Sequence, residues 1–273
     1  MNSFEQFDIN REREGKVEIN LDKEIRNYVD IDESDISNVN ENVKDILGTE
    51  SLNDEGAKYY SFSSKERLEN FIKNNIPDGD NLLRDNASFY INPETKEKMF
   101  FNCTSEEEIL KIKEHCHDLE KTKQAIKNNI LSSFAHETAH TSSFFSKHGN
   151  KETANMWEQE QICVYIGEKI RGDISDLLYS EGLIKDEGFD DFDLDSGSWK
   201  EFKKGKGVEA NFFYPFLVKE YGLGKIRDIW NLLQKDSNIE KAIEIILKKS
   251  STEIINDFKE KIKDRDYLKN IYN

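Results

Sequence analysis

The chain of 273 residues is long enough for one large or two small domains with a hydrophobic core. Its formal net charge of −16 disfavours nucleic acid or an anionic membrane as a partner, because phosphate groups would be repelled. The three cysteines, Cys103, Cys116 and Cys163, cannot all pair with one another, and their spacing predicts free thiols. The chain as given has no 18-residue apolar run and no leader pattern, so we expect a cytoplasmic protein unless a leader has been removed.

The first hundred residues are predicted to form a small sheet with helices between its strands. Strict alternation of polar and apolar residues predicts a strand over 16–21. Three further elements are expected before residue 80, namely a helix over 39–48, a strand over 59–62 and a helix capped by Ser63 to Glu66 that runs to residue 76.

A β-hairpin and a long helical segment follow. Residues 87–91 and 98–101 have the composition of two strands joined by a polar loop. Helical periodicity then predicts one helix to about residue 119 and a second helix over 121–147. The three side chains of His115–His117 would spread over about 200° around the axis of the first helix, so we do not expect them to bind one ion together.

The helix over 121–147 carries His136, Glu137 and His140 in an H-E-x-x-H arrangement. Positions four apart lie one turn above each other, so the two imidazoles project from one face and can bind one ion. Zinc suits these ligands and needs a third protein ligand, with water in the fourth position of a catalytic site. Glu137 lies about 100° round the helix and can reach that water without binding the metal. The alternative, a surface helix with two unrelated histidines, fits the small and apolar neighbouring residues less well.

A second helix, predicted over 151–170 and ending at Gly172, is expected to supply the third ligand. Glu160 stands twenty residues after His140, and an antiparallel return of the chain would bring it beside the histidines. Glu158 is the rival, but it points to a different face of the same helix. Apolar positions flank Glu160, and a buried carboxylate requires a cation, so the pattern favours Glu160.

These two segments resemble the gluzincin metallopeptidases, the peptidase MA-like group related to thermolysin and the zinc aminopeptidases. The segment His136–His140 matches their H-E-x-x-H motif, and Trp157–Tyr165 is similar to their W-x-x-E-G-x-A-x-Y motif. Gln161 and Cys163 stand where the family has Gly and Ala. The resemblance covers roughly residues 120 to 265.

The resemblance implies that His136, His140 and Glu160 bind Zn²⁺ and that Glu137 is the catalytic base. It also implies an α+β fold, in which a small mixed β-sheet precedes a zincin-type pair of metal helices and an α-helical C-terminal lobe. In this family an edge strand holds the substrate backbone, and 98–102 is the candidate for that strand. A hairpin that only covers the core is the alternative.

The C-terminal third is expected to contain an acidic loop followed by helices. The stretch Asp191–Asp195 begins like a calcium loop, but Ser196 and Phe202 occupy positions that need Gly and Glu, so a loop beside the cleft is the preferred interpretation. Four amphipathic helices are predicted over 210–221, 225–234, 238–248 and 251–262, with Gly222 and Gly224 as breaks. The expected domains are an N-terminal region with the sheet over 1–103, a zinc-binding helical core over 104–181, and the acidic loop with the C-terminal lobe over 182–273.

The resulting functional hypothesis is zinc-dependent hydrolysis of a peptide bond in a peptide or protein substrate. An endopeptidase is favoured, because the G-x-M-E-N motif that anchors the amine of aminopeptidase substrates is absent. Tyr214 lies in the region where relatives carry the residue that stabilises the oxyanion, with Tyr165 and His148 as further candidates. The alternative is an inactive gluzincin-like scaffold that binds a peptide or protein partner, although the presence of Glu137 favours the enzyme.

Overall fold

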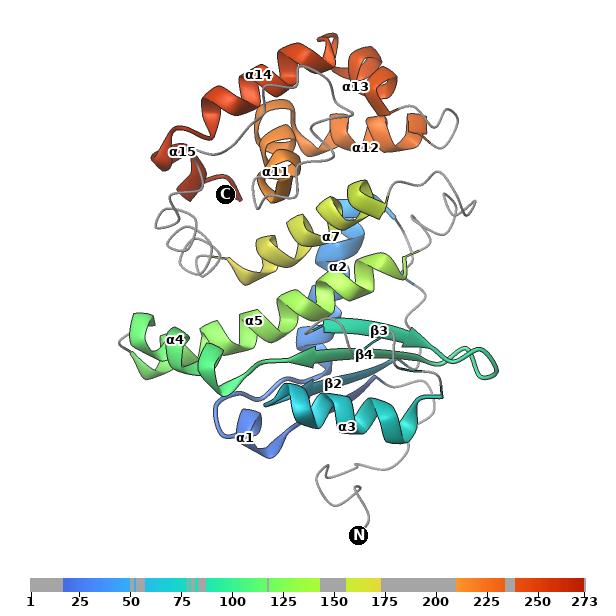
Figure 1. The fold of residues 1–273 in the computed structure, drawn as a ribbon, viewed down its shortest axis with the longest axis vertical. Coiled ribbons are helices and arrows are strands. Elements are labelled where there is room, and N and C mark those ends of the chain that lie inside the picture. Colours follow the sequence, from blue (N-terminus) through green and yellow to red (C-terminus); the bar gives the residue numbers. More distant parts are fainter. Residues whose placement is uncertain are drawn as a thin grey trace. The chain divides into compact units, whose positions relative to one another are not determined.

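The computed structural model describes residues 17–49, 52, 57–77, 79, 82, 87–116, 118–142, 156–172, 210–233 and 239–272 (Figure 1). These residues have the predicted α+β fold, with a small mixed sheet in the N-terminal region and helices in the C-terminal region. They group into two compact units. The first unit contains the described residues up to 44 and from 52 to 142, and the second contains 45–49 and those from 156 onward.

The first unit is built on a four-stranded sheet of order β1-β2-β4-β3. Its strands are β1 (Glu18–Leu21), β2 (Lys58–Phe62), β3 (Ala87–Ile91) and β4 (Lys98–Cys103). The strands β1, β2 and β4 run parallel, and β3 pairs antiparallel with β4 as the predicted hairpin. We expected the segment 98–102 to be the edge strand that holds the substrate backbone, and the strand order shows that this was wrong. The segment lies in β4, which pairs on both sides, so the edge strand of the hairpin is β3.

Helices cover both faces of this sheet. The first unit holds α1 (Lys23–Arg26), α2 (Glu33–Leu47, of which residues to 44 belong to this unit), α3 (Lys65–Asn75), α4 (Glu106–Cys116) and α5 (Leu119–His140). Figure 1 shows α3 and α5 on opposite sides of the sheet. Successive strand residues point to opposite faces, so Tyr60 packs in the cluster that contains α3, whereas the Tyr59 ring contacts Phe134 of α5.

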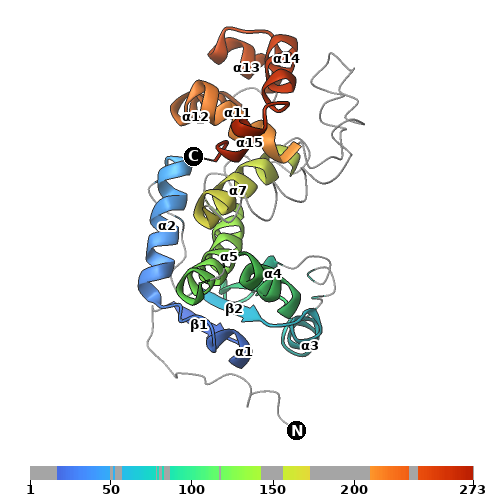
Figure 2. The ribbon, with the colours of Figure 1, turned by 90° about the vertical axis from the view of Figure 1, so that its left-hand side faces the viewer.

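The helix α5 is the longest of the described helices, and α2 crosses it, as Figure 1 and Figure 2 show together. The Lys127 Nζ atom of α5 lies 2.7 Å from Asp35 Oδ1 of α2. The N-cap of α5 is Asp118, whose side chain accepts a hydrogen bond from the Lys121 backbone N–H.

The helix α5 ends at His140, whereas the sequence pattern predicted a helix to residue 147. The hydroxyl of Thr141 donates a hydrogen bond to the Thr138 carbonyl oxygen at 3.0 Å, and Ser142 follows. Hydroxyl side chains compete for backbone partners in this way, which explains the earlier end of the helix.

The second unit consists of helices in the described residues. They are α7 (Met156–Arg171), α11 (Ala210–Tyr221), α12 (Leu223–Leu233), α13 (Ile239–Leu247), α14 (Ser251–Lys261) and α15 (Arg265–Lys269). Its core contains the rings of Phe213, Phe216 and Phe258, with centroids 5.2 to 6.0 Å apart.

Three glycines were predicted to end or interrupt helices of this unit. Gly172 (φ +68°) follows α7 and Gly222 (φ +84°) separates α11 from α12, as predicted, because both backbones have a positive φ that glycine accepts without strain. Gly224 lies inside α12, so its prediction as a break was wrong.

Several predicted features lie outside the described residues. They are the acidic loop with Asp191–Asp195, and the side chains of His115, His117 and His148. Cys103, Cys116 and Cys163 are free thiols, as predicted. Among the described helices, none combines the length and the apolar character that a membrane span requires.

Candidate metal site

The last two turns of α5 bring His136 and His140 together. Their Nε2 atoms lie 3.2 Å apart, and the ring centroids are 4.9 Å apart with an interplanar angle of 64°. Two nitrogens bound to one tetrahedral zinc ion at about 2.0 to 2.1 Å would stand about 3.3 Å from each other. The observed separation therefore fits a shared ion. It also fits a hydrogen bond between the rings, with the donor set by the tautomer.

Glu137 stands beside this pair in the same turn of the helix. The residue is only 6% exposed, and its Oε1 atom lies 4.0 Å from His136 Nε2. This distance exceeds a hydrogen bond. The carboxylate thus lies near the ring nitrogen that faces His140, without contacting it. A base beside a metal has to reach a water bound to the ion and leave the ion itself to the histidines, so this position is compatible with the predicted role of Glu137.

A row of aromatic side chains on the sheet ends at His140. The Phe89 ring of β3 stacks on the His140 imidazole, with centroids 6.2 Å apart and an interplanar angle of 20°. Phe89 pairs across the sheet with Phe100 of β4, which stacks on Tyr59 of β2 at 4.8 Å. The Tyr59 ring meets the Phe134 ring edge-on at 4.9 Å. The aromatic row Phe134, Tyr59, Phe100 and Phe89 therefore begins on α5 and returns to it at His140.

The sequence interpretation missed Phe89, although a signal for it was present. In the strand over 87–91, alternation places Phe89 on one face and Tyr90 on the other. Tyr90 packs with the cluster that contains α3. Phe89 must then face the side of the sheet that α5 covers. What local sequence does not encode is the register that places Phe89 opposite the last turn of α5.

The predicted third ligand belongs to the second unit. Glu160 and its rival Glu158 both lie in α7, and both of their side chains fall outside the described residues. In the part of the chain that the structure describes, no three His, Cys, Asp or Glu side chains form a group that could hold a metal ion. The structure thus brings together His136, Glu137 and His140, while the role of Glu160 stays a prediction.

Tyr214, the predicted oxyanion-stabilising residue, lies in the core of the second unit. It is buried in α11, and its ring centroid is 5.3 Å from that of Tyr165 in α7. Burial is the main cause that raises the pKa of both phenols above the ordinary value. A phenol enclosed in this way is suited to packing. The oxyanion role of Tyr214 stays a prediction, and its burial argues against that role.

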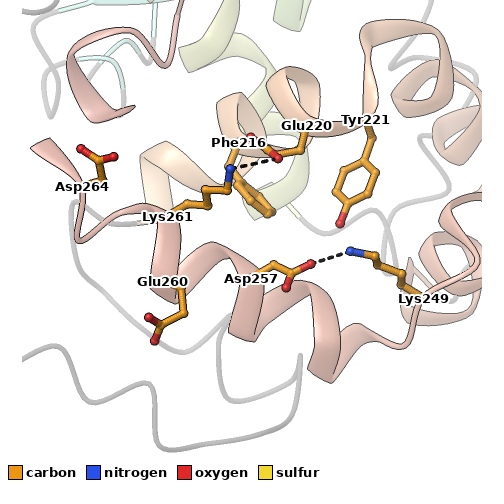
Figure 3. A pocket seen from close by; sticks show the side chains of 8 residues that line it. All are labelled: Phe216, Glu220, Tyr221, Lys249, Asp257, Glu260, Lys261 and Asp264. Carbon is orange, nitrogen blue, oxygen red and sulfur yellow. Dashed lines mark hydrogen bonds and ion pairs between the residues drawn. The ribbon is translucent and has the colours of Figure 1, made fainter. Parts of the chain in front are cut away.

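A cavity of about 460 Å³ in the second unit offers polar groups but few free ones (Figure 3). Lys249 Nζ lies 2.6 Å from Asp257 Oδ2, and Lys261 Nζ lies 3.5 Å from Glu220 Oε2. Each lysine also stands over a tyrosine ring, at 5.6 and 5.2 Å from the ring centroid. An anionic ligand would meet the carboxylates, and a cationic ligand would have to displace a lysine. The cavity is therefore a weaker candidate than the histidine pair.

Comparisons with known proteins identify no relative of this chain. No family model, no curated protein and no solved structure matches it. The gluzincin resemblance therefore depends on the motif residues themselves.

Proposed function

We propose that this protein is a zinc-dependent peptidase in which His136, His140 and Glu160 hold the metal. The observation that carries the proposal is the 3.2 Å separation of the two Nε2 atoms, with the Glu137 carboxylate beside them. Two imidazole nitrogens and one carboxylate oxygen are a ligand set that zinc commonly takes in catalytic sites.

The protein groups in this proposal have distinct tasks. Bound zinc would supply Lewis-acid chemistry, which activates water and polarises a substrate carbonyl. Glu137 accepts the proton of the attacking water at a carboxylate oxygen and then donates it to the nitrogen of the leaving amine. The burial of Glu137 limits competition from bulk water for that proton.

The edge of the sheet offers a place for the substrate backbone. In the described sheet β3 pairs only with β4, so its outer side retains backbone donors and acceptors. An extended peptide can add to such an edge as a further strand. Since Phe89 of β3 contacts His140, a peptide on this edge would run beside the histidine pair. The lack of an amine-anchoring motif favours cleavage within a chain.

A second candidate function follows from the same geometry. In that function the zinc is structural, and the chain is an inactive scaffold that binds a peptide or protein partner without cutting it. If the 3.2 Å separation instead reflects a hydrogen bond between the rings, the histidines are an isolated pair that holds no ion. Enzyme and scaffold differ in cleavage and in the effect of Glu137→Gln on it, whereas metal analysis identifies an isolated pair.

The test combines metal analysis with activity. The purified full chain is loaded with zinc and profiled against a peptide library, with and without a chelator. We expect Glu137→Gln to retain zinc and to reduce cleavage by about 10²- to 10⁴-fold, the usual contribution of a general base.

Glu120→Gln is the matched control. Glu120 is an exposed acid in the first turn of the same helix, and its side chain pairs with Lys123 at 2.8 Å. This variant should keep full activity. A wild-type chain that binds no zinc, or cleavage that Glu137→Gln leaves unchanged, would overturn the proposal.

A further inference from the structure

We infer that Phe89 is a positioning residue, which fixes the orientation of the His140 imidazole for metal binding. The inference rests on the proposed function. It adds a residue of β3 to a site whose three described members all come from α5.

The ring contact between Phe89 and His140 restricts the second side-chain torsion of His140, which the helix backbone does not restrict. The backbone of α5 restricts the first side-chain torsion, whereas rotation of an imidazole about its second torsion is broad. The Phe89 ring lies nearly parallel to the imidazole, at an interplanar angle of 20°. A flat neighbour at this angle favours ring orientations that keep the stack. The Nε2 atom in the observed orientation faces His136 Nε2.

Phe89 can restrict the His140 ring because the position of Phe89 is fixed by its strand pairing with Phe100. Its partner across the sheet, Phe100, is fully buried and stacks on Tyr59 with an interplanar angle of 15°. Strand pairing fixes the backbone of Phe89 and places its side chain on the same face of the sheet as that of Phe100. The His140 imidazole is thus anchored through the sheet as well as through its own helix.

Hydrogen-bonding groups that orient a metal ligand usually affect metal affinity by 10- to 100-fold when they are removed, and an aromatic stack contributes less than such a group. Phe89→Leu keeps apolar bulk and removes the flat ring face. We expect this variant to weaken zinc binding by about two- to tenfold. Phe89→Tyr keeps the ring and should restore most of the affinity.

Phe71→Leu is the control for a general loss of aromatic packing. Phe71 belongs to α3 on the other face of the sheet, where its ring centroid lies 4.8 Å from that of Tyr60. We expect this variant to bind zinc as the wild type does. Thermal unfolding of each variant shows whether a change in affinity only follows a change in stability.

The experiment measures zinc affinity of the full chain by competition with a chromophoric chelator. The histidine ring signals of the metal-free protein are recorded by NMR, and His140→Ala assigns those of His140. Weaker binding and shifted His140 signals in Phe89→Leu, but not in Phe71→Leu, would support the inference. Zinc binding that Phe89→Leu leaves unchanged, or weakens no more than Phe71→Leu does, would overturn the inference alone. A wild-type chain without zinc affinity would overturn the proposed function and the inference with it.

Discussion

The Nε2 atoms of His136 and His140 lie 3.2 Å apart at the end of α5, with both rings half-buried. Two protein ligands leave a catalytic zinc site one ligand short, since such sites use three. The sequence names Glu160 for that place and Glu158 as its rival. The two positions lie about 200° apart around α7, so at most one of them can face a given ion.

The first prediction separates these two glutamates. Glu160→Gln should lower zinc affinity by at least about a hundredfold, because a ligand matters more than the groups that support it. Glu158→Gln, which makes the same change two positions away, should bind zinc as the wild type does. Competition with a chelator measures both affinities. The reverse result would assign the metal to Glu158, and two unaffected variants would remove α7 from the site.

A second prediction concerns Tyr214. Its ring is buried against Tyr165 in the second unit, and burial raises the pKa of its phenol well above the ordinary value. A residue that stabilises an oxyanion must contact the substrate, which such burial disfavours. We expect Tyr214→Phe to keep peptide cleavage within about twofold of the wild type. A loss of about 10²-fold or more in kcat at unchanged KM would instead establish the oxyanion role.

The third prediction is a pH dependence in the first unit. Arg67 donates two hydrogen bonds to the Glu24 carboxylate, at 2.6 and 2.8 Å, and these bonds hold the pKa of Glu24 below its ordinary value. A lowered pKa in the folded state stabilises the fold above the unfolded pKa of about 4.3. That contribution is lost as the pH falls through the folded pKa. The Glu24 side chain is 37% exposed, so solvent screening keeps the contribution below about 1 kcal/mol.

Denaturant unfolding of Glu24→Gln at pH 7 and pH 3 tests this dependence. The variant should be less stable than the wild type at pH 7, and the difference should shrink at pH 3. Glu69→Gln is the control, because Glu69 contacts Lys73 only at 3.8 Å with the lysine largely exposed. A difference for Glu24→Gln that does not change with pH would contradict the expected role of its charge.

Most elements of the fold could be predicted from local patterns. The helix α11 has the predicted bounds, and the four strands lie within two residues of their predicted positions, since periodicity and helix caps are local signals. The order of the sheet could not be predicted in this way. The hairpin pattern shows that β3 and β4 are neighbours, but pairing of β4 with β2 depends on residues about forty positions apart in the chain.

The same distinction holds for the candidate site. His136, Glu137 and His140 were singled out because one helical turn places them together, and their side chains lie close to one another in the structure, whereas their roles in a metal site stay a prediction. Phe89 was missed because its contact with His140 joins segments about fifty residues apart. Such a contact follows from the register of the sheet under α5, which no local pattern specifies.

The end of α5 at His140 has an electrostatic consequence. The backbone dipoles of a helix add up to a partial negative charge at its C-terminus, which attracts cations within the last turn. A helix that continued to residue 147 would carry this charge about two turns beyond the histidines. With Thr141 at the C-cap, the terminal carbonyl groups belong to the same last turn as Glu137 and His140, where their partial negative charge favours a cation. Thus Thr141 and Ser142, which follow the last residue of the helix, help to determine the charge of the ligand that its last turn can accept.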